Sequence, residues 1–420
     1  MKNKLLIVFR IIYRLKDKIA FFPSIIAIGG CLFAYLMFFL EKKGISKYLL
    51  DIVPELVINN TETARSILTT FIAGLISIMV FSFSMVMILL NQASSNFSPR
   101  LLPGLISNRK HQIILGFYIA TILYCIFILV SIEPNEGKQE LPGFSVLMSI
   151  FFMVNCLAAF IYFIHSISEG IQINNIMDRI FLGSKRRLEH LIQNDKEIDF
   201  PSTEKWISYN SNKAGYLESI SFNAIAEIGK ANDCKIEILA IKGLFINKES
   251  ALYKTEKELD EDAIKALHSH FDFDKNELIE ENYVLAFKQI TEIAIKAMSP
   301  ALNDPGTALN AIDYLTQLFA LRLQKKETSY ICIEEKAWVT LATIDFKTLI
   351  YQVMVAFRTY CKHDTITVQK LLFMLNYLHK LAANNNEEYR KIIESEIKNL
   401  KIDAKKAIKN EIDSNIIGSI

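Results

Sequence analysis

The chain has 420 residues, 51% of them hydrophobic and 22% charged, with a formal net charge of +2. This near-neutral balance argues against a nucleic-acid partner, and six cysteines without a C-x-x-C pair support neither a zinc site nor a disulfide framework. The long uncharged stretches fall in the first 170 residues, and most of the charge follows them. The sequence therefore predicts a membrane-spanning part followed by a soluble part.

Four stretches of the chain are long and apolar enough to cross a bilayer, for which about 20 residues suffice. The first is too long for the apolar region of a signal peptide and has no small-residue cleavage site after it, so we expect it to be retained. The four expected spans are residues 19–40, 66–90, 112–132 and 141–168.

Lysine and arginine in the flanks predict the orientation of these spans. Positive charge gathers in the tail of residues 1–18, between the second and third spans, and after the fourth span. With four spans these three places share one side of the membrane. We therefore expect a bacterial plasma membrane protein with both termini in the cytoplasm, and with residues 41–65 and 133–140 outside.

The part after residue 168 is large enough for one or two soluble domains. Helical periodicity predicts a linking helix within residues 169–204, and short strands around one helix predict a small α/β or barrel-like unit over residues 205–255. Residues 256–420 are expected to form a helical cytoplasmic domain. The predicted fold class is thus a mainly α membrane protein, with a four-helix transmembrane region and a cytoplasmic α+β domain.

A polar stripe marks the second span, "SILTTFIAGLISIMVFSFSMVMILLNQASSNFSPR", because hydroxyl or amide side chains recur every seven residues. Seven residues advance a helix by nearly two turns, so these positions share one face. Two interpretations stay open: helix packing through small polar residues, or a water-filled path made by several copies around an axis. Phe81 would be the apolar constriction of such a path. The stripe consists of Thr70, Ser77, Ser84, Asn91 and Ser98.

A second motif, "SPALNDPGTALNAID", lies between two predicted helices. Ser299-Pro300 ends the first helix, and Asp304-Pro305 is a strong start signal for the second. The favoured interpretation is a turn between two helices, in which Asp304 caps the second helix and Asn303 bonds its own backbone. A turn at a contact between subunits is an intermediate interpretation. The alternative is an anion site at the start of the second helix, which the charge of Asp304 disfavours.

Two stretches carry a family resemblance: "LNQASSNFSPRLLPGLISNRKHQIILGFYIATILYCIFIL" and "FKQITEIAIKAMSPALNDPGTALNAIDYL". Together with the order of features along the chain, they resemble the bacterial membrane-protein family called domain of unknown function 2254. The resemblance covers nearly the whole chain and implies a topology, but it carries no established activity.

The function predicted from these patterns is a channel-like or transport-linked homo-oligomer in the lipid bilayer, with an ion or small solute passing along the second span. The alternative is a membrane-anchored sensor or scaffold whose spans only pack and whose cytoplasmic domain binds a ligand or partner. Because the sequence holds no phosphate-binding loop, nucleophile elbow or metalloprotease motif, we expect neither an enzyme nor a cofactor or metal site.

Overall fold

The computed structural model describes residues 20–46, 48, 58, 60–96, 109–132, 142–193, 198–241, 244–274, 282–334, 336–383 and 386–420. Contacts divide the chain into two compact units. The first, here called the membrane unit, is Met1–Ser95 with Pro99–Gln172. The second, here called the α+β unit, is Asn96–Ser98 with Ile173–Ile420.

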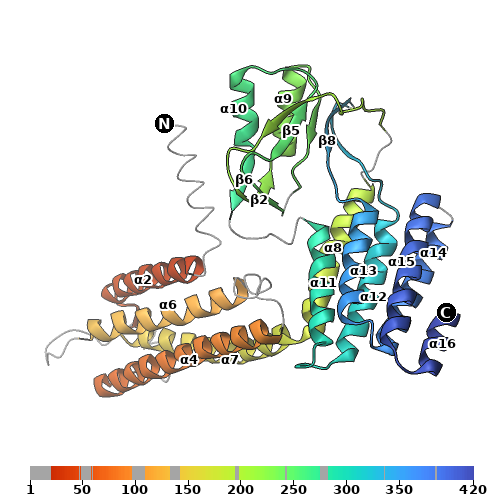
Figure 1. Cartoon of the computed structure of the whole chain (residues 1–420). Helices are drawn as coiled ribbons and strands as arrows, with labels where there is room; N and C mark the ends of the chain where they lie inside the picture. The colour runs from red at the N-terminus through yellow and green to blue at the C-terminus, as the bar shows by residue number, and fades with distance from the viewer. Residues whose placement is uncertain are drawn as a thin grey trace. The chain divides into compact units, whose positions relative to one another are not determined.

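Four long helices form the described part of the membrane unit (Figure 1). All four are long and apolar enough to cross a membrane, which confirms the four spans predicted from the sequence and implies a lipid bilayer around them. They are α2 (Phe21–Lys42), α4 (Thr61–Asn96), α6 (Arg109–Ser131) and α7 (Gly143–Ile171).

Close packing of α2 on α6 depends on two glycines. A Cβ atom built on Gly30 would lie 2.7 Å from the Cβ of Ala120, and one built on Gly116 would lie 2.9 Å from the Cδ1 of Ile26. Real side chains do not tolerate such distances, so glycine lets the two helix backbones approach each other. Small residues at a contact are the usual means by which helices associate in membranes.

The α+β unit begins with α8 (Ile173–Gln193) and continues into two sheets with two helices between their strands, α9 (Phe222–Ala231) and α10 (Glu261–Ser269). The five-stranded sheet has the order β1-β5-β3-β8-β7, and the three-stranded sheet has the order β4-β2-β6. The strands are β1 (Ile207–Asn210), β2 (Gly215–Ile220), β3 (Ile236–Ile238), β4 (Phe245–Ile246), β5 (Ala251–Thr255), β6 (Phe271–Asp274), β7 (Ser329–Ile333) and β8 (Lys336–Leu341).

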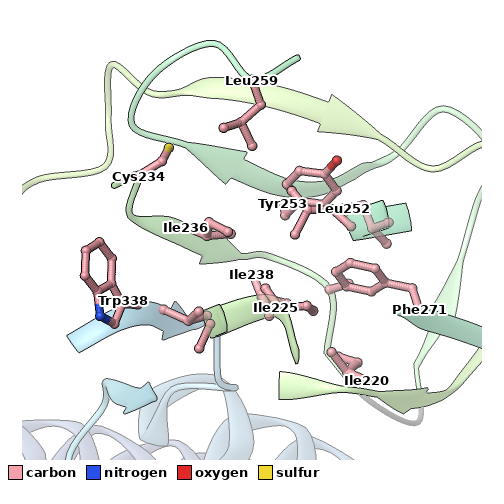
Figure 2. Close-up of a cluster of buried hydrophobic side chains, with 14 of the residues drawn as sticks. Ile220, Ile225, Cys234, Ile236, Ile238, Leu252, Tyr253, Leu259, Phe271 and Trp338 are labelled. Atoms are coloured by element: carbon pink, nitrogen blue, oxygen red, sulfur yellow. The ribbon is translucent and has the colours of Figure 1, made fainter. Parts of the chain in front are cut away.

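The larger sheet joins segments that are far apart in the sequence. Strand β3 pairs antiparallel with β5 on one side and parallel with β8 on the other, where Ile236 lies opposite Val339. The side chains of both sheets and of α9 enclose one apolar core, which includes Ile225, Tyr253 and Trp338 (Figure 2). The core therefore holds β8 in place against strands made much earlier in the chain.

Strands also occur where the sequence predicts a mostly helical domain. The segment 256–420 supplies β6, β7 and β8 beside its helices. The short hairpin of β7 and β8 turns at Glu334, which adopts a positive φ of 49°. Its strands are short and lie between long helical stretches. The pairing of β8 with β3 is set by contacts across the chain rather than by local sequence.

Six helices complete the α+β unit beside α8, and Figure 1 shows most of them side by side. Many start at an Asp or Asn whose side chain accepts a hydrogen bond from the first turn, for example Asp345, which accepts from the N–H of Thr348. The six are α11 (Tyr283–Ala297), α12 (Pro305–Arg322), α13 (Phe346–Tyr360), α14 (Thr365–Ala382), α15 (Glu387–Ala407) and α16 (Glu411–Ser419).

Candidate functional site

The predicted stripe lies on a face of α4 that the rest of the described chain leaves exposed. Its hydroxyls bond to their own helix: each donates to the carbonyl oxygen four residues earlier, over 2.7 Å in Thr70, 3.0 Å in Ser77 and 2.9 Å in Ser84. Asn91 is also exposed, whereas Ser98 lies outside the described residues. None of the three hydroxyls therefore needs a second helix to satisfy its donor.

A different face of α4 packs against the other spans. The buried positions Ala64, Leu68, Leu75 and Ser82 follow one another at four- and seven-residue steps and form a single seam. Because each residue turns a helix by about 100°, Leu75 and Ser77 point about 160° apart. The stripe is thus turned away from the seam by which α4 contacts its own chain.

Phe81 lies on the stripe face between Ser77 and Ser84. Its side chain is 50% exposed, and its ring meets that of Phe160 on α7 edge to face, with 5.9 Å between the ring centres. The contact fixes one edge of the ring and leaves the remainder facing outward. Phe81 is therefore positioned as an apolar residue within the exposed polar face.

Polar side chains also lie inside the membrane unit, where the sequence analysis did not place them. Among the described residues, the Ser82 hydroxyl, the Tyr118 hydroxyl and the Gln112 carbonyl oxygen are buried without a hydrogen-bond partner. The hydroxyl of Ser166 and a ring nitrogen of His111 lie 3.2 Å apart and join α7 to α6. These residues follow no common spacing along the sequence, so no periodic pattern indicates them.

A carboxylate holds the start of α7. Glu41 Oε1 accepts from the backbone N–H of Ser145 over 2.8 Å and from its hydroxyl over 2.7 Å, while Glu41 Oε2 accepts from the Ser46 hydroxyl over 2.6 Å. The hydroxyl of Tyr124 donates to the Ser145 carbonyl over 2.9 Å. A negative charge at a helix start satisfies unpaired N–H groups, so Glu41 ties the end of α2 to α7.

The motif between α11 and α12 forms a compact turn. Asp304 accepts from the Thr307 backbone N–H over 3.1 Å and from the Thr307 hydroxyl over 2.6 Å, with Pro305 at the first helical position. Asn303 has a positive φ of 46°, and its N–H donates to the carbonyl oxygen of Ser299 over 2.9 Å. Both carboxylate oxygens of Asp304 are thus occupied in capping the start of α12.

The same turn borders an open hollow of about 760 Å³. Ser299, Pro300 and Asn303 line one part of it, and Tyr360 and His363 from the end of α13 and the turn after it line another. The structure therefore brings together the motif of residues 299–305 and a second helix end that the sequence analysis did not connect with it.

An ion pair in the α+β unit joins the buried guanidinium of Arg322 to the partly exposed carboxylate of Glu327. Arg322 is fully buried, and its guanidinium donates to Glu327 over 2.6 Å and to the carbonyl oxygens of Lys325 and Ile344, each over 3.1 Å. The Tyr389 hydroxyl donates to Glu327 as well. Burial, followed by the hydrogen bond to Glu327, raises the pKa of Tyr389 to about 12. The pair joins α12, the start of α13 and α15, which is a structural role.

Within the part of the chain that the structure describes, no group of three or more His, Cys, Asp or Glu side chains could hold a metal ion. The absence of enzymatic activity and of a cofactor stays a prediction.

Comparisons with known proteins place the chain among membrane proteins without an assigned activity. Uncharacterised proteins of Mycobacterium tuberculosis strain H37Rv and of Mycobacterium bovis are each 25% identical over 270 residues, which is 60% of this chain. The match spans 51% of the length of these relatives, about half. No solved structure matches the chain.

A family model for predicted membrane proteins matches residues 16–377 and so covers most of the chain, including the described spans and both sheets. This match confirms the resemblance drawn from the two sequence motifs. The chain belongs to the predicted membrane-protein family called domain of unknown function 2254.

Proposed function

We propose that this protein is a channel-like or transport-linked homo-oligomer of the bacterial plasma membrane, with both termini in the cytoplasm and an ion or small solute as its cargo. The observation that carries the proposal is the position of the polar stripe on α4. It is exposed in the single chain and lies on the side away from the buried seam.

The length of the stripe supports a path more than a local contact. From Thr70 to Asn91 the helix rises by about 32 Å, at about 1.5 Å per residue. The hydrocarbon core of a bilayer is about 30 Å thick. A polar face of that length crosses the whole core, whereas packing of two helices at one crossing point needs only a few small residues.

The hydrogen bonds of the stripe are compatible with a helix face that contacts water. Since each hydroxyl of Thr70, Ser77 and Ser84 donates to its own helix, the oxygen keeps acceptor capacity for water or for a partly dehydrated cation. Phe81 on the same face supplies the apolar constriction at which such paths open and close by wetting. One α4 helix cannot enclose a path, so the proposal requires several copies around an axis.

A membrane-anchored sensor or scaffold remains the second candidate, in which the stripe packs against a neighbouring copy. The two candidates differ in whether water reaches the stripe. The capped turn at Asp304 and the hollow beside it fit either candidate, because a contact between subunits is needed in both.

A cysteine-accessibility scan in proteoliposomes separates them. In a chain whose native cysteines are replaced, Thr70→Cys, Ser77→Cys and Ser84→Cys are treated with a charged, membrane-impermeant thiol reagent. We expect modification at all three positions, together with solute or ion flux that the modification blocks. Ile76→Cys is the matched control, because Ile76 is exposed at the same depth but on another face. Protection of all three stripe positions, or no flux under voltage or tension, would contradict the proposal.

A further inference from the structure

A cavity with positive charge lies inside the α+β unit, away from the motifs that the sequence analysis singled out. It has a volume of about 90 Å³, and beside it lies a wider hollow of about 690 Å³. The two share lining residues from α8, the start of α9 and the hairpin of β7 and β8. The shared residues are Arg187, Leu191, Ile220, Phe222, Ser329 and Leu341.

The charges around this pair of cavities all have one sign. Arg187 lines both cavities, and Lys325 lines the inner one. No Asp or Glu is among the described residues that line either cavity. A pocket lined by positively charged side chains and by no carboxylate is complementary to an anion.

The buried position of these cations makes an anionic ligand more favourable. Lys325 is only 1% exposed, and its ammonium donates to the carbonyl oxygen of Lys326 over 2.6 Å. The Nε of Arg187 is buried and has no hydrogen-bond partner among the described residues. Burial lowers the pKa of the Arg187 guanidinium, which nevertheless stays charged near neutral pH. A ligand oxygen would satisfy this donor and offset the burial of the charge.

The start of α9 adds backbone donors to the same wall. Ser221, Phe222, Asn223 and Ala224 line the outer hollow, and the Ser221 side chain makes no capping hydrogen bond. The first N–H groups of a helix have no partner within the helix, and with the helix dipole they favour phosphate. Phe222 and Tyr330 supply aromatic surface beside these donors. The wall thus combines hydrogen-bond donors suited to an anion with aromatic side chains suited to stacking against a planar organic group.

We propose that this pocket binds a soluble small molecule through a phosphate group, with the phosphate between Arg187 and the start of α9 and the organic part against Phe222 and Tyr330. A volume of about 690 Å³ is within the usual range for small-molecule sites and accommodates a mononucleotide. The site goes beyond the proposed function, because it stands whether or not α4 lines a path. It gives the protein a soluble ligand to which the α+β unit responds.

The test measures binding to the full-length protein in nanodiscs, by calorimetry and by the midpoint of thermal unfolding. The probes are inorganic phosphate, AMP and adenosine. We expect AMP or phosphate to raise the midpoint, because a ligand that binds only the folded state stabilises it. Adenosine, which lacks the phosphate, should leave the midpoint unchanged. Tighter binding of AMP than of phosphate would support a phosphate ester as the ligand, whereas binding of phosphate without AMP would overturn the assignment of an organic part to the wall of Phe222 and Tyr330.

Substitution of Arg187 locates the site. We expect Arg187→Gln to weaken binding by about tenfold or more, the effect of losing one charged hydrogen bond. The matched control is Arg186→Gln, because Arg186 is exposed on the same helix and lines neither cavity. Arg187→Lys keeps the charge but removes the buried Nε donor; it should weaken binding less than Arg187→Gln and serves if that variant fails to fold.

Three further results would overturn the assignment. The first is an unchanged midpoint with millimolar phosphate and millimolar AMP. The second is equal binding of adenosine and AMP, which would show that the phosphate is not recognised. The third is an equal effect of Arg187→Gln and Arg186→Gln on affinity, which would place the bound anion elsewhere.

Discussion

The hydroxyls of the stripe on α4 and the buried Arg322 of the α+β unit satisfy their hydrogen bonds in opposite ways. On α4, Ser77 bonds to a carbonyl of its own helix and stays at the surface of the chain. In the α+β unit, Arg322 is fully buried and its partners include Glu327 and the carbonyl of Ile344. A polar group satisfied locally leaves its face available for another molecule, whereas a buried charge satisfied from several segments ties those segments together. The first arrangement leaves the polar face exposed, and the second holds several segments of the fold together.

The largest effect is expected from removing the buried guanidinium of Arg322. Arg322→Met should lower the stability of the α+β unit by about 3–5 kcal/mol, because three hydrogen bonds of a charged group, to Glu327 and to the carbonyl oxygens of Lys325 and Ile344, would be lost. Hydrogen exchange of α12 to α15 in the full-length protein measures the loss.

The exposed pair of Arg390 and Glu394, 3.5 Å apart, supplies the matched control for this substitution. Arg390→Met should cost no more than about 1 kcal/mol, as is usual for surface pairs. The double variant Arg322→Met with Glu327→Gln should recover part of the stability. Equal losses in Arg322→Met and Arg390→Met would show that the buried pair does not tie the helices together.

An intermediate effect is expected where two spans approach closely. Gly30→Ala should destabilise the packing of α2 on α6 by about 1–3 kcal/mol, the usual cost of overpacking, because the new Cβ would meet Ala120 at 2.7 Å. The rate at which a thiol reagent reaches the buried Cys125, followed by mass spectrometry in detergent, reports the loosening.

Gly29→Ala is the control for this contact, since a Cβ on Gly29 meets nothing within 4 Å. The two substitutions have the same chemistry and differ by one position on the same helix. If both leave the labelling of Cys125 unchanged, the described contact does not hold the membrane unit together.

The smallest effect is expected on the stripe. Ser77→Ala should change the stability of the membrane unit by less than about 0.5 kcal/mol, because the Ser77 hydroxyl contacts only its own helix. Ser145→Ala in the same unit should cost more, about 1–3 kcal/mol, because it removes a buried hydrogen bond to Glu41. Thermal unfolding in one detergent compares them, and a loss in Ser77→Ala as large as that in Ser145→Ala would mean that the stripe is a packing surface.

Sequence patterns predict the membrane unit better than the α+β unit, for a physical reason. A span is recognised from the apolar length that the bilayer demands, and the helix starts at Asp304 and Pro305 are local signals as well. The pairing of β3 with β8 and the ion pair of Arg322 with Glu327 depend on contacts between segments, which no local period records. The role of Glu41 could not be predicted from the sequence either, because its partner Ser145 belongs to another span.

The same limit applies to the candidate sites. The seven-residue spacing of Thr70, Ser77 and Ser84 is visible in the sequence, and so is their common face. That this face is turned away from the chain's own seam follows only from which α4 residues are buried. No sequence pattern predicts the proposed phosphate pocket, because Arg187, Phe222 and Lys325 come together from three separate segments.

The central place of β8 in the larger sheet has a consequence for synthesis of the chain. Because β3 pairs with β8, the edge of β3 stays open until the ribosome has added Leu341. By then β1 to β5 have been synthesised, and the half-made sheet has an unpaired edge. Such edges recruit strands from other chains. Slow translation between β5 and β7 should therefore favour aggregation of nascent chains.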